Sequence, residues 1–263
     1  MNNREIVHSI KDYVRNYQEI NKTESNWREP IIGFAKASDP LFLKLKEIVS
    51  PTHATPSELL DDAKSVIVYF IPFETGIILS NIDEEESSRE WDIAYIETNN
   101  LISGLTQDMH DKILQAGYRA TNIPPTYNYD QEKLISDWSH RSVAYISGIG
   151  TFGMNNMLIT ESGCCGRLGS IVTSLELEPS ERKEVENCLY KFNKSCMKCA
   201  DRCVNNAFIK TNENYTFDRH NCNEQIYDKI IPVYPNGLGD TCGKCMCKVP
   251  CSFTNPTKNL IEK

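Results

Sequence analysis

The most constraining feature of this 263-residue chain is the confinement of its cysteines to the C-terminal part. None of the eleven precedes Cys164, and residues 196–203 read CMKCADRC, a C-x2-C-x3-C motif. A second C-x2-C motif, at Cys242 and Cys245, leads to Cys251. Thiolate sulfur is a soft ligand that suits iron–sulfur clusters and zinc, and a two-residue spacing lets one turn present both sulfurs to one centre. The pattern therefore predicts a metal-binding C-terminal segment.

Composition favours metal ligation over disulfide bonding. The chain is 40% hydrophobic and 24% charged, which is typical of a soluble globular protein. Its longest apolar stretch, residues 66–73, falls far short of the roughly 20 residues that a membrane span needs. The N-terminus has scattered charges and no apolar core, so we expect no signal peptide and a cytoplasmic location. Disulfides are not expected in that reducing compartment.

The cysteine spacing predicts two interleaved [4Fe-4S] clusters. Two-cluster ferredoxins use C-x2-C-x2-C-x3-C-P, and the fourth cysteine ligates the other cluster. Here Asn193 stands at the first ligand position and Val204 replaces the proline. With Cys188 as the substitute first ligand, we predict a first cluster on Cys188, Cys196, Cys199 and Cys251. The second takes Cys203 with three of Cys222, Cys242, Cys245 and Cys247, and we favour the set that leaves Cys247 spare. Two four-cysteine zinc sites are the alternative.

The residues before this segment predict an α/β (α+β) core. Helical periodicity and start signals predict helices over 4–18, from Pro40, at Pro56, and over 88–116 and 131–147. Apolar, β-branched runs predict strands over 31–35, 65–71, 118–122 and 167–177. We place a boundary in the polar stretch 179–186, which gives a core domain over 1–182 and a cysteine-rich domain over 183–263.

Two further motifs lie in the core. The glycine-rich turn at 148–153, GIGTFG, follows a predicted helix rather than a strand, so it does not match a dinucleotide fingerprint. Its glycines indicate either a tight turn or close approach of the backbone to a flat ligand. Cys164 and Cys165 stand outside the cluster motifs. They are interpreted as small buried residues, with a redox or cofactor-facing thiol as the alternative.

Three residues are candidate acid–base groups. Asp137 lies three positions before His140 and is expected on the same face of the predicted 131–147 helix. An Asp–His pair there could hold a proton near a redox cofactor. Tyr127, in the preceding loop, is a further candidate proton donor. For each of them a purely structural role is the alternative.

The order of four segments resembles the cobalamin-dependent iron–sulfur reductases typified by epoxyqueuosine reductase and the reductive dehalogenases. Residues 56–67 (PSELLDDAKSVI) resemble a strand entry of that family. Residues 140–153 (HRSVAYISGIGTFG) resemble its R-x-x-A and glycine-rich segment. Residues 155–160 (NNMLIT) and 166–170 (GRLGS) resemble the segments that follow. The cysteine motifs then close the chain as in the family, so the resemblance spans nearly the whole sequence.

The resemblance implies a nitroreductase-like corrinoid-binding core with a C-terminal double-cluster ferredoxin-like domain. It implies base-off cobalamin, with one cluster close enough to the corrin to supply electrons. Ferredoxin or flavodoxin would be the electron donor. The implied contacts to the corrin or its tail are Gly148, Gly150, Gly153, Asn155, Asn156, Leu158, Gly169 and Ser170.

The sequence departs from the family at two functional positions. Leu134 aligns with the acidic proton donor of epoxyqueuosine reductase, and Met154 replaces a lysine after the glycine turn. The formal net charge is −8, and the chain stops twelve residues after Cys251, without the family's C-terminal repeat region. Because phosphate binding usually needs a basic face, we expect no nucleic-acid partner.

Three functions follow as expectations. The first is an iron–sulfur, cobalamin-binding oxidoreductase that reduces a small organic substrate. The second is an electron carrier, or a reductive activator of a corrinoid protein, without a substrate of its own. The third is epoxyqueuosine reduction on tRNA.

Overall fold

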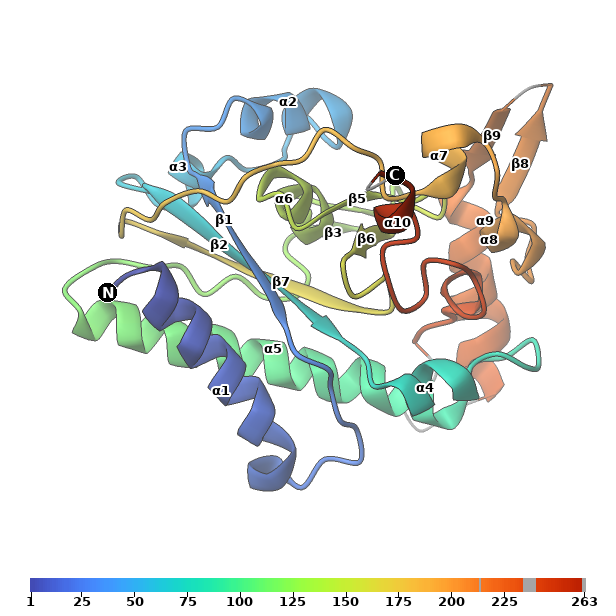
Figure 1. Ribbon diagram of the computed structural model, residues 1–263, viewed down its shortest axis with the longest axis horizontal. Helices are drawn as coiled ribbons and strands as arrows, with labels where there is room; N and C mark the ends of the chain where they lie inside the picture. The colour runs from blue at the N-terminus through green and yellow to red at the C-terminus, as the bar shows by residue number, and fades with distance from the viewer. Residues whose placement is uncertain (213, 234–239, 262–263) are drawn as a thin grey trace.

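The computed structural model describes residues 1–212, 214–233 and 240–261 of the chain. Its centre is a three-stranded antiparallel sheet in the order β1-β2-β7, formed by β1 (Ile31–Lys36), β2 (Ser65–Pro72) and β7 (Gly166–Thr173). Val68 of the central strand pairs with Gly33 on one side and with Ser170 on the other. All eight residues of β2 are buried, because helices cover both faces of the sheet (Figure 1).

Side chains of β2 alternate between two apolar cores. Ile67, Tyr69 and Ile71 pack into the core shared with α1 (Asn3–Asn21) and α5 (Arg89–Gln115). The intervening residues of β2 face a second core beside α2 (Leu41–Ile48) and α6 (His140–Ile146). The segment after Cys188 lies toward the right-hand end of this sheet in Figure 1.

Helix boundaries follow local capping signals. In α1, the Asn2 side chain accepts a hydrogen bond from the backbone of Glu5, and the Glu5 carboxylate accepts one from Asn2, which forms a capping box. Ser88 caps α5 by accepting from the backbone N–H of Trp91. Two short helices, α3 (Pro56–Leu59) and α4 (Thr75–Ser80), also belong to this half of the chain. The glycine-rich segment 148–153 contains the short strand β5 (Gly150–Phe152).

Two sequence predictions of secondary structure are wrong. Residues 118–122 form no strand; only Ala120 bridges to Thr173 at the end of β7. The predicted helix 131–147 is instead a small hairpin of β3 (Tyr129–Asp130) and β4 (Ile135–Ser136), followed by the shorter α6. Leu134 has a φ of 54°, and the backbone N–H of Asp137 donates to the carbonyl of Tyr127, so neither continues a helix.

The segment after Cys188 is made of short elements. They are α7 (Leu189–Asn193), α8 (Lys198–Asp201), the hairpin of β8 (Phe208–Thr211) and β9 (Asn214–Phe217), α9 (Arg219–Glu224) with a π-helical continuation over Gln225–Ile230, the 3-10 turns Ile231–Val233 and Lys244–Met246, and α10 (Lys258–Ile261). A third small hairpin, β5 with β6 (Leu158–Thr160), lies between the sheet and this segment (Figure 1).

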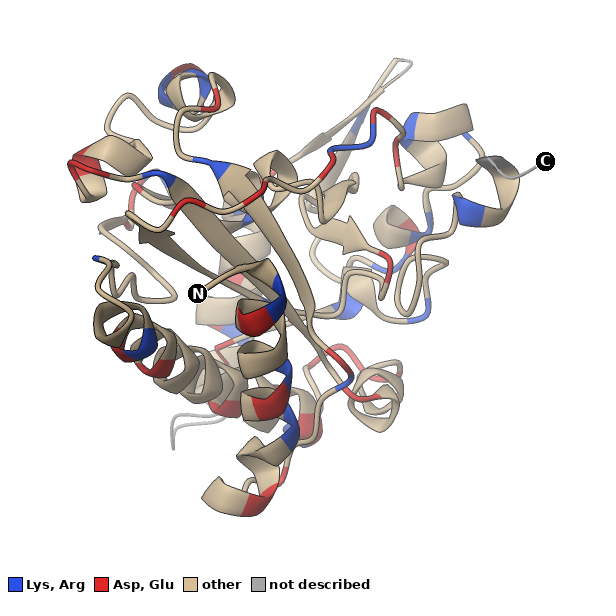
Figure 2. Ribbon diagram, turned by 60° about the vertical axis from the view of Figure 1, so that its left-hand side comes forward, with Lys and Arg blue, Asp and Glu red and all other residues tan. Residues whose placement is uncertain are grey.

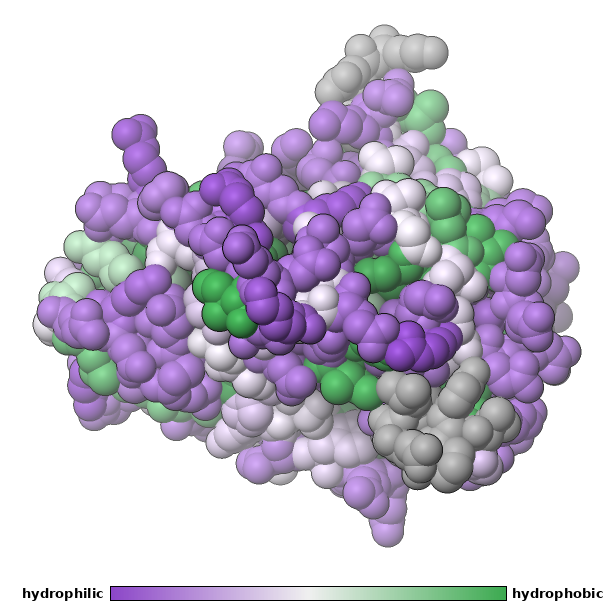
Figure 3. Space-filling model, turned by 90° about the horizontal axis from the view of Figure 1, so that it is seen from below, coloured by the Kyte–Doolittle hydropathy of each residue, from purple (hydrophilic) through white to green (hydrophobic). Residues whose placement is uncertain are grey.

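The cysteine-rich segment shares an apolar core with the rest of the chain. Cys188, Tyr190, Met246 and Cys247 belong to the same buried cluster as α1 and α5. Apolar side chains also remain visible at the surface on this half of the molecule (Figure 3). The predicted boundary at residue 182 stays a prediction. No helix in the described ranges is long and apolar enough to cross a membrane.

Candidate metal centre

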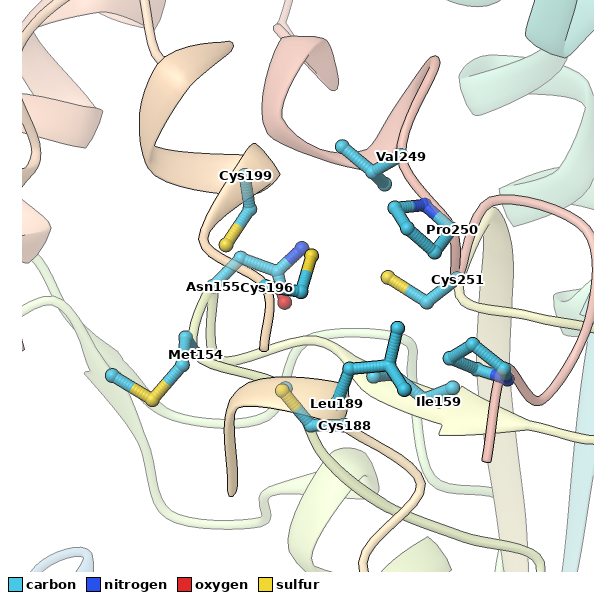
Figure 4. Close-up of a pocket in the computed structure, with 12 residues that line it drawn as sticks. Met154, Asn155, Ile159, Cys188, Leu189, Cys196, Cys199, Val249, Pro250 and Cys251 are labelled. Carbon is cyan, nitrogen blue, oxygen red and sulfur yellow. The ribbon is translucent and has the colours of Figure 1, made fainter. Parts of the chain in front are cut away.

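The four cysteines of the predicted first set line one small cavity. Its volume is about 20 Å³, and Cys188, Cys196, Cys199 and Cys251 are in its wall. Figure 4 shows these four side chains arranged around a common space, with the sulfur of Cys251 directed toward the side of Cys196. Cys188 precedes α7, the next two flank the start of α8, and Cys251 comes from the C-terminal loop. Chain segments about fifty residues apart thus meet at one point.

Backbone contacts fix the loop that carries Cys251. Its carbonyl accepts a hydrogen bond from the N–H of Cys164, with an N–O distance of 2.9 Å. Gly163 has a φ of +82°, and a Cβ there would stand 2.7 Å from the carbonyl oxygen of Cys251. Only glycine fits this turn between β6 and β7 without displacing the loop. The core therefore positions one thiol of the set directly.

The predicted second set lines a larger cavity. Its volume is about 190 Å³, and its wall contains Cys203, Cys222, Cys242 and Cys245. Asn155 lines both cavities, and its Nδ2 donates to the carbonyl of Cys245 at 3.2 Å. The two cysteine sets are therefore neighbours separated by a shared polar residue.

Electrostatics keep the thiols of Cys199 and Cys242 protonated unless a cation compensates. Burial, followed by the charges of Cys251 and Cys188, raises the pKa of Cys199 to about 12. Burial also raises the pKa of Cys242 to about 11. Bound metal displaces thiol protons and supplies the missing positive charge. The donor set thus fits a thiolate-ligated metal centre.

The arrangement of the cysteines helps to distinguish a single metal ion from an iron–sulfur cluster. In the part of the chain that the structure describes, no group of three or more His, Cys, Asp or Glu side chains is placed to hold a single metal ion. A [4Fe-4S] cluster takes one thiolate on each of four irons, so its ligands surround a space instead of one ion. The four cysteines of each predicted set line one cavity.

The remaining cysteines are buried beside the cavities. Cys247 is fully buried, lines neither cavity, and accepts a hydrogen bond from Asn81 Nδ2 at 3.6 Å. The Cys165 thiol donates to the carbonyl of Met246 at 3.3 Å. The Cys164 sulfur lies 3.9 Å from that of Cys251. Burial raises the pKa of Cys165, which fits an inert packing thiol.

The predicted acid–base residues lie apart from both cavities. The Asp137 carboxylate accepts from the Thr52 hydroxyl at 2.5 Å, and Asp137 precedes α6, so it does not share a helical face with His140. His140 is buried, with Nδ1 2.9 Å from Ser170 Oγ and Nε2 3.0 Å from the Pro124 carbonyl. Tyr127 is half-buried against the second core.

The residues expected to contact a corrin divide into two groups. Gly153 and Asn155 line the small cavity. The other members line neither cavity: Gly148, Gly150, Asn156, Leu158, Gly169 and Ser170. A Cβ on Gly150 would meet the Ile159 carbonyl at 2.5 Å, and one on Gly169 would meet the Tyr69 ring. These two glycines serve internal packing and do not form an open cradle.

Several lining residues of the larger cavity were not predicted. They come from the residue after β2, the N-terminal part of α5 and the start of β7: Phe73, Trp91, Tyr95 and Arg167. Lys244 also lines the cavity; its Nζ donates to the carbonyls of Asn81 and Asp83 at 3.3 and 2.6 Å. The position of Lys244 between Cys242 and Cys245 could have indicated that it lies near the second cysteine set. The other four residues are far from these cysteines in the sequence, so nothing local indicated them.

Comparison with solved structures identifies the fold. A selenomethionine-labelled epoxyqueuosine reductase matches 95% of this chain and 70% of its own, with 19% identity and a TM-score of 0.50. An epoxyqueuosine reductase bound to an epoxyqueuosine-modified tRNA stem loop matches 91% and 64%, with 20% identity and a TM-score of 0.50. The catabolic reductive dehalogenase NpRdhA matches 86% and 30%, with 17% identity and a TM-score of 0.55.

The chain has the fold of these reductases. The predicted resemblance is thereby confirmed at the level of a mixed α/β architecture. The chain spans 64–70% of the length of the two epoxyqueuosine reductases and 30% of the dehalogenase. No protein-family model and no curated protein matches the sequence.

Proposed function

We propose that this chain is an iron–sulfur oxidoreductase that passes electrons through two [4Fe-4S] clusters to a small organic substrate. One observation carries the proposal: the two sets of four cysteines suggested by spacing line two separate, neighbouring cavities. A four-iron cluster ligated by four thiolates supplies one-electron transfer at low potential. In this proposal Cys188, Cys196, Cys199 and Cys251 hold one cluster, and Cys203, Cys222, Cys242 and Cys245 hold the other.

The proposal divides the chain by role. Residues 1–182 form a nitroreductase-like, substrate-binding core, and residues 183–263 form a ferredoxin-like double-cluster region. Ferredoxin or flavodoxin would deliver electrons in the cytoplasm. Asp137 and Tyr127 stay candidate proton donors, whereas both ring nitrogens of His140 already have partners.

Cobalamin belongs to the proposal as a further cofactor, supported by the order of the sequence motifs and by the shared fold. A corrin would supply a metal centre able to reduce a substrate bond. Two of the glycines expected to contact it, Gly150 and Gly169, face atoms of this chain where a Cβ would stand, so these two offer no open surface to a corrin. We therefore assign no reaction step to it.

Anaerobic reconstitution followed by electron paramagnetic resonance tests the proposal. We expect about eight irons and eight sulfides per chain, and reduced-cluster signals after dithionite. Added cob(II)alamin should give a spectrum without the nitrogen splitting of the lower base. An unchanged cob(II)alamin spectrum would show that no corrin binds, and the proposal would be reduced to a two-cluster protein. Iron content near zero would contradict the whole proposal.

An electron carrier or corrinoid-protein activator is the second candidate. The observation that favours it is the position of Asp137, His140 and Tyr127, none of which lines either cavity. Electron transfer to a corrinoid protein without turnover of any small molecule would support this candidate.

Action on tRNA is the third candidate. One structure of the same fold carries a tRNA stem loop, which weakens the expectation from net charge that nucleic acid is no partner. Restoration of queuosine in cells that lack their own epoxyqueuosine reductase would support it. Failure of restoration by cluster-loaded protein would count against it.

A further inference from the structure

The two C-x2-C motifs carry a lysine at the same position. Residues 196–199 read CMKC and residues 242–245 read CGKC, so Lys198 and Lys244 each stand directly before the second cysteine of a motif. The surroundings of the two lysines differ. The Lys198 side chain is 64% exposed, and its Nζ pairs with the Asp201 carboxylate at 3.3 Å. Lys244 is 1% exposed, and among the lysines and arginines that the structure describes it alone is buried.

A glycine and an aromatic ring explain why the second lysine is buried. Gly243 has a φ of +70°, and a Cβ there would collide with the ring of Trp91. Only glycine allows the ring to lie so close to this turn. Trp91 Nε1 also donates to Thr241 Oγ1 at 3.1 Å, which holds the ring over the motif. Met197 occupies the equivalent position of the first motif with a φ of −133°, so the two turns differ in backbone as well as in side chain.

The ammonium group of Lys244 is held by the loop between α4 and α5. Its Nζ donates to the carbonyl of Asn81 at 3.3 Å and to that of Asp83 at 2.6 Å. Asn81 is itself fully buried, and its Nδ2 donates to the carbonyl of Cys242 at 2.8 Å. The loop and the second motif therefore fix each other, and the lysine charge lies where they meet.

No acidic side chain cancels this charge at close range. Within the described ranges the Lys244 ammonium contacts backbone carbonyls and forms no ion pair, whereas Lys198 has one. Asp83 offers its carbonyl, and its side chain is exposed. Asp92, in the first turn of α5, is buried but lies beyond ion-pair distance, so it weakens the field of the lysine without cancelling it. Other charges of the chain are mixed in sign at the surface, as along α1 in Figure 2.

The buried charge stands directly beside the second cysteine set, since Lys244 lines the same cavity as Cys242 and Cys245. A [4Fe-4S] cluster on four thiolates has a net negative charge that grows by one when the cluster is reduced. A fixed positive charge in the protein interior favours the more negative state, whereas water screens an exposed and paired lysine. Because local charge is one of the properties that set the reduction potential of a cluster, the two motifs should give their clusters different potentials.

We propose that Lys244 holds the reduction potential of the second cluster above that of the first, and so directs electrons from the first cysteine set to the second. This inference rests on the proposed function, because it takes both clusters as present. One electron leaves the first cluster and enters the second, with no bond or proton moved. The first set then accepts electrons from a ferredoxin or flavodoxin. The second set, whose cavity also reaches Phe73 and Tyr95 of the core, delivers them.

Potentiometric titration followed by electron paramagnetic resonance measures both potentials in the reconstituted protein. Cys251→Ser and Cys203→Ser, each expected to keep one cluster, assign the two signals. Lys244→Met removes the buried charge, and Lys198→Met removes its exposed counterpart as the matched control. We expect the second cluster to have the higher potential, and Lys244→Met to lower it by about 59 mV or more, a tenfold change in a one-electron equilibrium. Lys198→Met should leave the potential of the first cluster nearly unchanged.

A second variant, Lys244→Gln, separates charge from packing, because glutamine is neutral but still donates hydrogen bonds. It should lower the second potential as Lys244→Met does, and a lowering by methionine alone would overturn the proposal. If Lys244→Met does not assemble the second cluster, Lys244→Gln and the order of the two potentials still decide the matter.

The order of the potentials is the other decisive result. Equal potentials in the unsubstituted protein, or a higher potential in the first cluster, would overturn the proposal. Equal effects of Lys244→Met and Lys198→Met on their own clusters would do the same. Iron content near zero would contradict the proposed function together with this inference, whereas about eight irons per chain with any of these results would contradict the inference alone.

Discussion

At the scale of single residues, His140 shows how a candidate catalytic group becomes a structural one. Trp138 Nε1 donates to Ser170 Oγ at 2.9 Å, and the same hydroxyl contacts His140 Nδ1. The other ring nitrogen contacts the Pro124 carbonyl. Burial lowers the pKa of His140 to about 4. The imidazole is therefore neutral near pH 7, with its hydrogen-bonding capacity satisfied inside the core.

A pH dependence of stability follows. Because the folded pKa of His140 lies below its unfolded value, the unfolded chain binds more protons between these values, and stability falls as pH falls from about 6.5 toward 4. Between pH 7 and pH 5 this group alone should remove about 2 kcal/mol from the free energy of unfolding. Urea titrations at pH 7 and pH 5 measure the free energy of unfolding. Between these pH values it should change by about 2 kcal/mol less in His140→Gln than in the unsubstituted protein. An equal dependence in both proteins would show that His140 titrates normally.

The cysteine sets could be predicted from the sequence, because the spacing of ligands along the chain can be recognised without knowing the fold. Each predicted set lines one cavity, and the role of these cysteines as ligands stays a proposal. Arg167 and Tyr95 could not be predicted, because their proximity depends on how β7 packs against α5. Asp137 was expected beside His140 on a helix that does not extend that far.

At the scale of elements, helices with strong periodicity were predicted well. The apolar positions of α1 and α5 repeat at helical spacing, and both begin at side chains that cap them. The prediction of a helix over 131–147 was wrong because tertiary contacts outweigh the helical periodicity of that segment. The backbone N–H of Ala54 donates to the carbonyl of Asp137 at 2.8 Å, which holds the chain extended before α6.

The turn between β6 and β7 is expected to control the first cysteine set. A side chain at Gly163 would meet the backbone of residues 251–253, so Gly163→Ala should displace Cys251 and lower iron by about four per chain. Gly117→Ala is the matched control, because Gly117 also has a positive φ but no atom within 4 Å of an added Cβ. Full iron content in Gly163→Ala would mean that this contact does not position the loop.

At the scale of the whole molecule, the cysteine-rich segment is fastened to the core by polar contacts between distant parts of the chain. Arg28 donates to three carbonyls: Phe73 at 2.8 Å, Ser162 at 2.8 Å and Phe253 at 3.1 Å. Trp91 Nε1 donates to Thr241 Oγ1 at 3.1 Å. The end of β2, the β6–β7 turn and the C-terminal loop therefore meet at one guanidinium.

Replacement of the Arg28 guanidinium should destabilise the packing of the C-terminal loop against the core. Arg28→Lys keeps the charge but cannot reach three carbonyls in one plane, so we expect a loss of about 1.5–3 kcal/mol in unfolding free energy. Denaturant unfolding of the reconstituted protein, followed by circular dichroism and by cluster absorbance, measures it. Arg15→Lys on the exposed face of α1 should be neutral. A neutral Arg28→Lys would show that the junction is held by other contacts.

The central claim is that two cysteine sets hold two separate clusters, and iron content of single variants tests it most directly. Cys251→Ser and Cys203→Ser should each retain about four irons per chain, one cluster having been lost in each case. Cys247→Ser, a buried cysteine that lines neither cavity, should retain about eight. Loss of iron in Cys247→Ser, or full iron in either of the other variants, would contradict the assignment of the two sets.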